Sequence, residues 1–152
     1  MVELVETLVI QAPGARCFDL ARSVELHVQS TAGTQERAVE GVTFGLLNQN
    51  EEVTWEATHL GVRQRLTSRI TEFNRPRHFR DSQVRGPFRR FDHDHFFDED
   101  GGNTIMRDAF DYTSPMGWLG RFVDRIFLED YMQGFLQKRA EVIKATAEKM
   151  PQ

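Results

Sequence analysis

Two histidines, His93 and His95, stand two residues apart in an alternating run from Phe88 to Asp98. In an extended strand, residues at this spacing point to the same face and lie about 7 Å apart. Imidazole is a frequent metal ligand and can act as a base near neutral pH. The pair therefore predicts polar groups in a cavity, a general base or two ligands of a metal ion.

A metal site would need a third ligand beside this pair. His59 or Asp108 could supply it only if the fold brings their strands next to His93 and His95. The simpler arrangement is that the histidines line a cavity or pair with Asp108. We therefore expect no metal ion, and since no glycine-rich cofactor loop occurs, we expect no cofactor.

Alternate residues of a strand point to opposite faces, which sorts the predicted strands into a covered and a solvated face. The covered face is mainly apolar but includes seven polar groups: His59, Gln64, Ser68, His93, His95, Asp108 and Tyr112. A dry core rarely holds so many, because each unpaired buried polar group costs about 1 to 3 kcal/mol. We predict that these residues surround a ligand cavity. The expected ligand-binding residues are Trp55, His59, Phe91, His93, His95, Met106, Asp108, Phe110, Tyr112, Trp118 and Phe122.

The elements that must position these side chains follow from hydrophobic periodicity and turn residues. The sequence predicts a strand from Val2 to Gln11, one or two short helices from Pro13 to about Ser30, and a C-terminal helix from Ser114-Pro115 to about Met150. Between the helices, we expect strands at 34–42, 52–60, 61–73, 78–85, 88–98 and 103–112. Their short connections predict antiparallel neighbours. The fold class is therefore α+β, with a curved antiparallel sheet of about seven strands.

Composition limits the function classes. The chain has 152 residues, which fits one domain spanning 1–152, and its net charge of -4 argues against a nucleic-acid partner. Its many arginines, such as Arg63, Arg65 and Arg69, are expected to pair with outward acids such as Glu52 and Glu56.

We expect no transmembrane segment, because the sequence contains no run of about 20 apolar residues. The acidic N-terminal segment does not resemble a signal peptide, and the single cysteine, Cys17, fits a soluble cytoplasmic protein. We expect a monomer or weak homodimer.

The order of one strand, two short helices, about six strands and a long helix resembles the START-like, birch-pollen-allergen-like superfamily, also called SRPBCC proteins. The segments 52–97 (EVTWEATHL…DHDHFF) and 114–132 (SPMGWLGRFVDRIFLEDYM) look like the polyketide cyclase/dehydrase-like, ligand-binding branch found in bacteria. The resemblance implies a helix-grip fold, in which the sheet wraps around the C-terminal helix and a cavity between them holds apolar molecules such as lipids or polyketides.

The resemblance leaves the chemistry open, because fold alone does not determine function. We expect binding of a small hydrophobic or amphipathic molecule. A first alternative is a cyclase/dehydratase-like lyase or isomerase in which His93 or His95 acts as the base and Asp108 or Tyr112 orients a carbonyl oxygen. A second alternative is a protein-interaction module, which would expose an apolar patch instead of enclosing a void.

Overall fold

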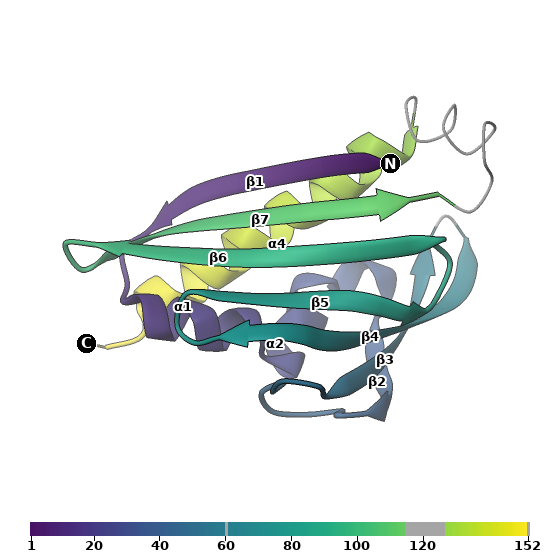
Figure 1. Cartoon of the computed structure of the whole chain (residues 1–152), viewed down its shortest axis with the longest axis horizontal. Coiled ribbons are helices and arrows are strands. Elements are labelled where there is room, and N and C mark those ends of the chain that lie inside the picture. Colours follow the sequence, from purple (N-terminus) through teal and green to yellow (C-terminus); the bar gives the residue numbers. More distant parts are fainter. Residues whose placement is uncertain (60, 115–126, 152) are drawn as a thin grey trace.

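The computed structural model of the chain describes residues 1–59, 61–114 and 127–151. Within these ranges, seven antiparallel strands form one curved sheet that wraps around helix α4 (Figure 1). The strands are β1 (Val2–Ile10), β2 (Arg37–Gly41), β3 (Glu52–His59), β4 (Val62–Asn74), β5 (His78–Arg85), β6 (Arg90–Asp100) and β7 (Asn103–Thr113). The helices are α1 (Gly14–Ala21), α2 (Val24–Ser30), the 3-10 turn η1 (Ala32–Thr34) and α4 (Glu129–Lys149).

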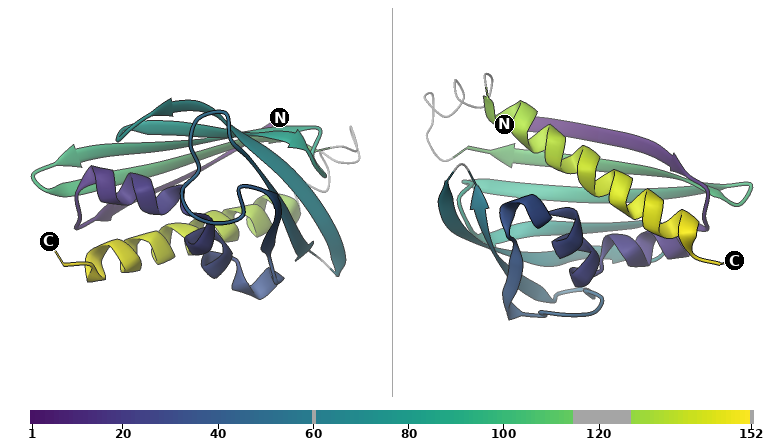
Figure 2. Two further views of the ribbon diagram at one scale, coloured as in Figure 1. Left: turned by 90° about the horizontal axis from the view of Figure 1, so that it is seen from below. Right: turned by 180° about the vertical axis from the view of Figure 1, so that it is seen from behind.

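The strand order in the sheet is β1-β7-β6-β5-β4-β3-β2, so the first strand pairs with the last and all other neighbours are consecutive in the chain. Helices α1 and α2 carry the chain from the β1 edge to the β2 edge. Seen from behind, α4 runs diagonally across the concave face of the sheet, with α1 and α2 beside it (Figure 2). The helices thus form one layer and the sheet the other, as the predicted α+β helix-grip fold requires.

Most predicted strand boundaries lie close to the observed ones, and β5 has the predicted limits. The strand β2 begins later than expected, because residues 32–34 form a 3-10 turn and Gln35 then takes a left-handed φ of 54° that an extended strand does not allow. The predicted start of the C-terminal helix at Pro115 lies outside the described residues, which show this helix from Glu129 onward.

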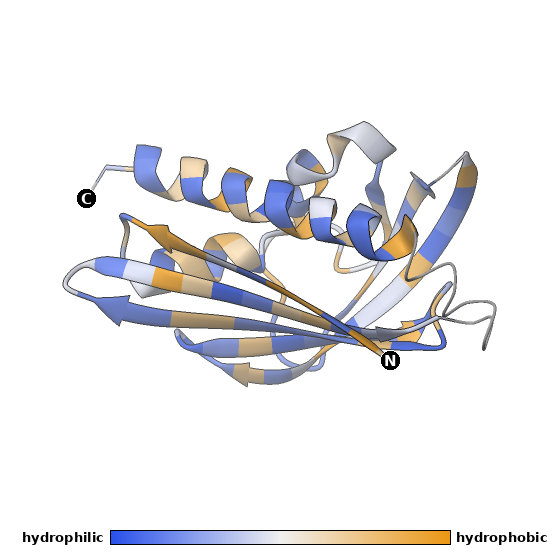
Figure 3. Ribbon diagram, turned by 90° about the horizontal axis from the view of Figure 1, so that it is seen from above, coloured by the Kyte–Doolittle hydropathy of each residue, from blue (hydrophilic) through white to orange (hydrophobic). Residues whose placement is uncertain are grey.

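One face of α4 is buried against the sheet and the other helices. Leu136, Ala140, Ile143 and Ala147 recur at three- and four-residue spacing and are each less than 5% exposed. Hydropathy colouring shows polar residues on the opposite side of the helix (Figure 3). Two residues of this helix differ from what residue type and spacing predict. A charged side chain such as Arg139 is expected to face solvent, but it lies on the buried face three residues after Leu136. The helical spacing of apolar residues puts Phe127 on the buried stripe, but it is 51% exposed.

Alternation along the strands is largely as predicted, with two exceptions at β4. Val62 alternates in step with the covered Gln64 and Ser68 but is exposed, because it lies at the tip of the β3–β4 hairpin beside Gly61. Thr67 alternates in step with the outward Arg63 and Arg65 but is buried, and its hydroxyl forms a 2.8 Å hydrogen bond with the hydroxyl of Thr54 on the neighbouring strand.

The buried apolar residues form two clusters with polar groups between them. In the larger one, Phe18 of α1 meets the rings of Phe73, Phe79 and Phe97 edge-on at centroid distances of 5.2 to 5.5 Å. The smaller one includes Phe91 and other aromatic residues of the sheet. Along the inward face of β6, His93 and His95 therefore stand between Phe91, which belongs to the smaller cluster, and Phe97, which belongs to the larger one.

Candidate ligand cavity and its charged wall

A cavity of about 330 Å³ lies between the concave face of the sheet and helices α2 and α4. Apolar atoms supply most of the surface that lines it, which is usual for a small-molecule site, although polar residues also contribute. The apolar lining residues are Trp55, Ala57, Leu66, Pro87, Phe88, Phe91, Phe110, Leu128, Met132, Phe135 and Leu136. The polar ones are His27, Thr31, Glu36, His59, Gln64, Arg65, Ser68, Asp81, His93, Ser114, Tyr131 and Arg139.

The predicted ligand-binding residues fall into three groups. Those that line the cavity are Trp55, His59, Phe91, His93 and Phe110. Four others, His95, Met106, Asp108 and Tyr112, are buried on the same face of the sheet but are packed behind the lining. The remaining two, Trp118 and Phe122, lie outside the described residues.

His95 lies between two carboxylates. Its Nδ1 is 2.7 Å from Oδ1 of Asp108 on β7, and its Nε2 is 2.9 Å from Oδ1 of Asp81 on β5. An ionised carboxylate only accepts hydrogen bonds, so both ring nitrogens must donate and the ring is an imidazolium. Burial and the charge of Arg139 lower the pKa of His95, but the bonds and charges of Asp108 and Asp81 outweigh them and raise it. The ring also stacks on Phe79 at 4.2 Å between centroids.

His93 stacks against His95, with 3.9 Å between the ring centroids. Burial first, and then the neighbouring charge of His95, lower its pKa, so His93 is the neutral member of the pair. Its Nδ1 is 3.8 Å from Oδ1 of Asp81, and its Nε2 is 3.5 Å from Oδ1 of Asp108. The latter contact is too poorly aligned for a hydrogen bond, and Nε2 has no other hydrogen-bond partner in the described part of the chain.

Arg139 of α4 completes the cluster. Its Nη2 donates to the carbonyl oxygen of Ala21 at 2.6 Å, and its Nη1 is 3.6 Å from Oδ2 of Asp108. The guanidinium therefore links the long helix to the end of α1 and to β7. Because Ala21 is the last residue of α1, the cation also faces the carbonyl end of that helix, where positive charge is favourable.

The charges of this cluster balance. Burial opposes ionisation of Asp108, but the close contact of His93, the hydrogen bond and charge of His95 and the charge of Arg139 hold its pKa well below the usual range. The pKa of Asp81 is lowered for similar reasons, with the His95 bond as the main favourable cause. Two carboxylates thus face one imidazolium and one guanidinium. An unbalanced charge at this depth would cost several kcal/mol.

A second polar group lies at the β3 side of the cavity. Glu36, whose side chain is 9% exposed, accepts a bond from Nε2 of His27 at 2.9 Å, and that imidazole packs against the Trp55 indole at 4.2 Å between centroids. Nearby, Nδ1 of His59 is 2.9 Å from the hydroxyl of Tyr131 on α4. β3 and β6 are three strand spacings apart, about 14 Å along the sheet. The cavity therefore has ionisable groups at its β3 side and at its β6 side, with the neutral polar side chains of Gln64 and Ser68 on β4 between them.

Sequence reasoning missed Asp81, Arg139, Glu36 and Tyr131. Asp81 alternates with Phe79 along β5, a signal that places it on the covered face. Arg139 has the helical spacing of Leu136 and Ile143, which places it on the buried face of α4. Its charge was the only reason to expect it in solvent. Glu36 falls inside the strand predicted at 34–42, but it stands in an irregular segment between η1 and β2, so the alternation of a strand does not describe it.

The outward face of the sheet carries the arginines that the sequence assigned to ion pairs. Glu56 accepts bonds from Arg37, Arg63 and Arg65, and hydrogen bonds from Arg37 and Arg65 lower its pKa to about 2. Arg69 pairs with Glu52 on the adjacent strand. The predicted pairing of this basic run is confirmed for these residues.

Solved structures with the same architecture span nearly the whole chain. The protein TTHA0849 of Thermus thermophilus has a TM-score of 0.77 and 17% identity over 96% of this chain and 97% of that one. The Zhui aromatase/cyclase of Streptomyces sp. R1128 has a TM-score of 0.77 and 15% identity, covering 97% and 94% of the two chains. Ginseng major latex-like protein 151 of Panax ginseng has a TM-score of 0.70 and 17% identity over 96% and 97%.

This chain shares the helix-grip fold of these proteins. No protein-family model and no curated protein matches it, so the likeness is one of fold. The helix-grip architecture accounts for the place of the cavity, since the concave sheet and α4 enclose it from two sides. No described helix is long and apolar enough to cross a membrane.

We predict that Asp108→Asn lowers the free energy of unfolding by about 3 to 5 kcal/mol, because it leaves two buried cations, His95 and Arg139, with only the carboxylate of Asp81 to balance them. Denaturant unfolding at neutral pH measures the change. The matched control is Asp111→Asn on the same strand, whose carboxylate is one-third exposed and pairs with Arg90, and it should cost less than about 1 kcal/mol. Equal losses in the two variants would contradict the charge balance proposed for the buried cluster.

Glu36 predicts a stability effect that depends on pH. Burial opposes its charge, but His27 lowers its pKa below the ordinary value of 4.5. A depressed pKa stabilises the fold above the unfolded-state pKa and loses this effect as the pH falls through the folded-state pKa. Glu36→Gln should therefore cost about 1 to 2 kcal/mol at pH 7 and progressively less below about pH 4.5.

Denaturant unfolding of both proteins from pH 7 to acid measures this difference. Glu40→Gln, which changes an exposed carboxylate, should show neither the loss nor the pH dependence. A difference between wild type and Glu36→Gln that stays constant through the acid range would rule out the buried, ionised Glu36.

Proposed function

We propose that this protein binds one small hydrophobic or amphipathic molecule, of the lipid or polyketide kind, in the cavity between sheet and α4. The observation that carries this proposal is the cavity of about 330 Å³, whose walls present mostly apolar surface and which has ionisable groups at its β3 side and at its β6 side. Pockets that hold small organic ligands usually start at about this size and have this composition.

Apolar and polar lining residues would contribute to binding in different ways. Apolar surface from Trp55, Phe110 and Leu136 would supply affinity at about 25 cal/mol per Å² of ligand and wall removed from water. The polar lining residues would fix the orientation of the ligand by hydrogen bonding to it. The neutral ring of His93 and the carboxylate of Asp81 line one side of the cavity, and the carboxylate of Glu36 lines the other side. A rigid ligand with an oxygen or nitrogen function near each end matches this pattern.

Catalysis is a second candidate, favoured by one observation. His93 lines the cavity as a neutral imidazole, which is the form that can accept a proton from an activated carbon. One neighbour in fold is named an aromatase/cyclase. The predicted alternative of a cyclase/dehydratase-like enzyme therefore stays a proposal, with His93 as its base. Asp108 and Tyr112, behind the lining, would act through other residues instead of touching the substrate.

The remaining expectations concern the setting of the protein. Cys17 is fully buried in the apolar cluster around Phe18, which suits a cytoplasmic protein whose thiol stays reduced. The net negative charge and the ion-paired outward arginines favour a small molecule over nucleic acid as partner. An interaction-module role would rely on exposed apolar residues such as Val9 and Ile105, which are paired neighbours on the convex face.

A bulky ring inside the cavity should abolish ligand binding. Ala57 lines the cavity from β3 and is 4% exposed, so Ala57→Phe places a phenyl group in the space that a ligand needs. We predict that this variant binds the neutral fluorescent probe N-phenyl-1-naphthylamine at least about tenfold more weakly than wild type, because tenfold corresponds to only about 1.4 kcal/mol of lost contact. Fluorescence titration measures the affinity.

Val84→Phe is the matched control. It adds a ring of the same kind on the convex side of β5, where Val84 is 43% exposed, and should leave probe affinity unchanged. Equal binding by wild type and Ala57→Phe would refute the cavity as the binding site. Mass spectrometry of the purified wild type under native and denaturing conditions then identifies any molecule that copurifies.

A further inference from the structure

We infer that Asp81, His93 and His95 form a binding site for a divalent transition-metal ion of the zinc or cobalt kind. One ligand atom from each residue lies within 4.8 Å of the other two. The sequence pattern left the two histidines without a third ligand, and its candidates were His59 and Asp108. In the fold, His59 pairs with Tyr131 instead, and the third donor comes from β5.

One buried carboxylate, that of Asp108, is hydrogen-bonded to the ring of His95 and lies close to the ring of His93. Oδ1 of Asp108 is 2.7 Å from Nδ1 of His95 and 3.5 Å from Nε2 of His93. The other nitrogen of each ring, Nε2 of His95 and Nδ1 of His93, therefore faces Oδ1 of Asp81, at 2.9 and 3.8 Å. A carboxylate behind the histidine ligands is the usual way in which proteins orient metal-bound imidazoles.

The spacing of the donor atoms fits a small metal ion. Ligands about 2.0 to 2.1 Å from a tetrahedral zinc ion lie about 3.3 Å from one another. The two distances from Asp81 Oδ1, 2.9 and 3.8 Å, lie on either side of that value. Small movements of Asp81, whose side chain is 22% exposed, are enough to equalise them.

The site opens toward the cavity. Asp81 and His93 both line it, while His95 and Asp108 close the opposite side. Two histidines and one carboxylate leave at least one coordination position vacant, as in mononuclear metal sites that bind a substrate or water. Metal binding releases the Nε2 proton of His95 to solvent, since only an unprotonated nitrogen can coordinate the ion. With both histidines neutral and Asp81 and Asp108 offsetting the metal charge, Arg139 leaves one positive charge in excess. The vacant position therefore suits an anionic oxygen donor, such as a carboxylate, phenolate or enolate.

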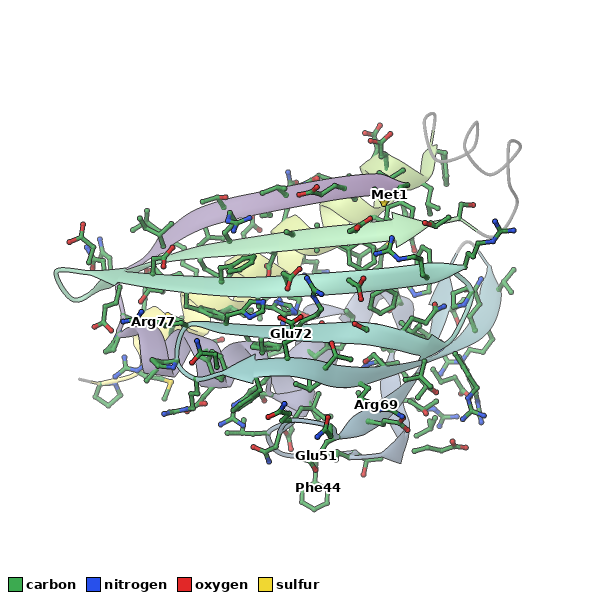
Figure 4. The ribbon with its side chains drawn as sticks, in the orientation of Figure 1. Met1, Phe44, Glu51, Arg69, Glu72 and Arg77 are labelled. Atoms are coloured by element: carbon green, nitrogen blue, oxygen red, sulfur yellow. The ribbon has the colours of Figure 1, made fainter. Side chains whose placement is uncertain are left out.

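A second cluster provides an internal control. Glu72, His78 and Asp94 also bring three donors together. Asp94 stands between His93 and His95 in the chain, so its side chain lies on the convex face. Glu72 is labelled in Figure 4, on the side of the sheet away from α4. Arg80 donates hydrogen bonds to both carboxylate oxygens of Asp94, at 2.9 and 2.8 Å. These bonds occupy the oxygens that would have to coordinate a metal ion.

The test on the wild-type protein uses Co²⁺, which is paramagnetic and coloured in low-symmetry sites. We expect one Co²⁺ per chain by visible absorption, with NMR broadening of the ring signals of His93 and His95 and sharp signals from His78. Stronger broadening of His78, or no saturable binding at millimolar Co²⁺, would overturn the inference. Neither readout depends on ligand binding, so failure of the metal site and failure of the proposed function are distinguishable.

Three variants then assign the ligands. Asp81→Asn should weaken Co²⁺ binding at least about tenfold, and His78→Asn should not change it. His93→Cys keeps a donor at the site and should give the near-ultraviolet charge-transfer band of a cobalt thiolate. A folded His93→Cys protein that binds Co²⁺ without this band, or an Asp81→Asn protein with wild-type affinity, would contradict the assignment.

Discussion

The structure depends on how one buried carboxylate is neutralised. Asp108 has no exposed surface and lies in the middle of a sheet–helix interface that is otherwise mostly apolar. Its charge is acceptable only because His95 donates to it and the guanidinium of Arg139 lies beside it. These partners come from β6 and α4, and Asp81 adds β5. A single electrostatic requirement thus fixes the positions of three neighbouring strands relative to the long helix.

This requirement also shapes the cavity. The charged cluster lies between the apolar core around Phe18 and the smaller one around Phe91, which Leu66 connects by packing against both. Beside it the sheet curves away from α4, and aromatic residues line the space that remains. The charged cluster is held by hydrogen bonds between elements far apart in the chain. At the β3 side, His59 and Tyr131 make another such contact, and His27 and Glu36 make one between residues close in sequence.

Much of this could be predicted from the sequence, because the signals are periodic. Alternation along β6 and β7 placed His93, His95 and Asp108 on the covered face, and the stripe around Leu136 and Ile143 predicted the buried side of α4. The partners of those groups were harder to predict. Strand register decides that Asp81 stands opposite His93, and no local pattern encodes it. Arg139 was missed because a charged residue at a core position is stable only beside a partner that the sequence does not reveal.

The proposed function requires that a small apolar molecule bind in the cavity between the sheet and α4. The most direct measurement is a titration of isotope-labelled protein with N-phenyl-1-naphthylamine, followed by NMR shifts assigned to single residues. The account predicts saturable one-to-one shifts at Ala57, Met132 and Leu136, which line the cavity, and none at the exposed Val5 and Val9 on the outer face of β1. Shifts confined to Val5 and Val9, or none at all, would contradict it.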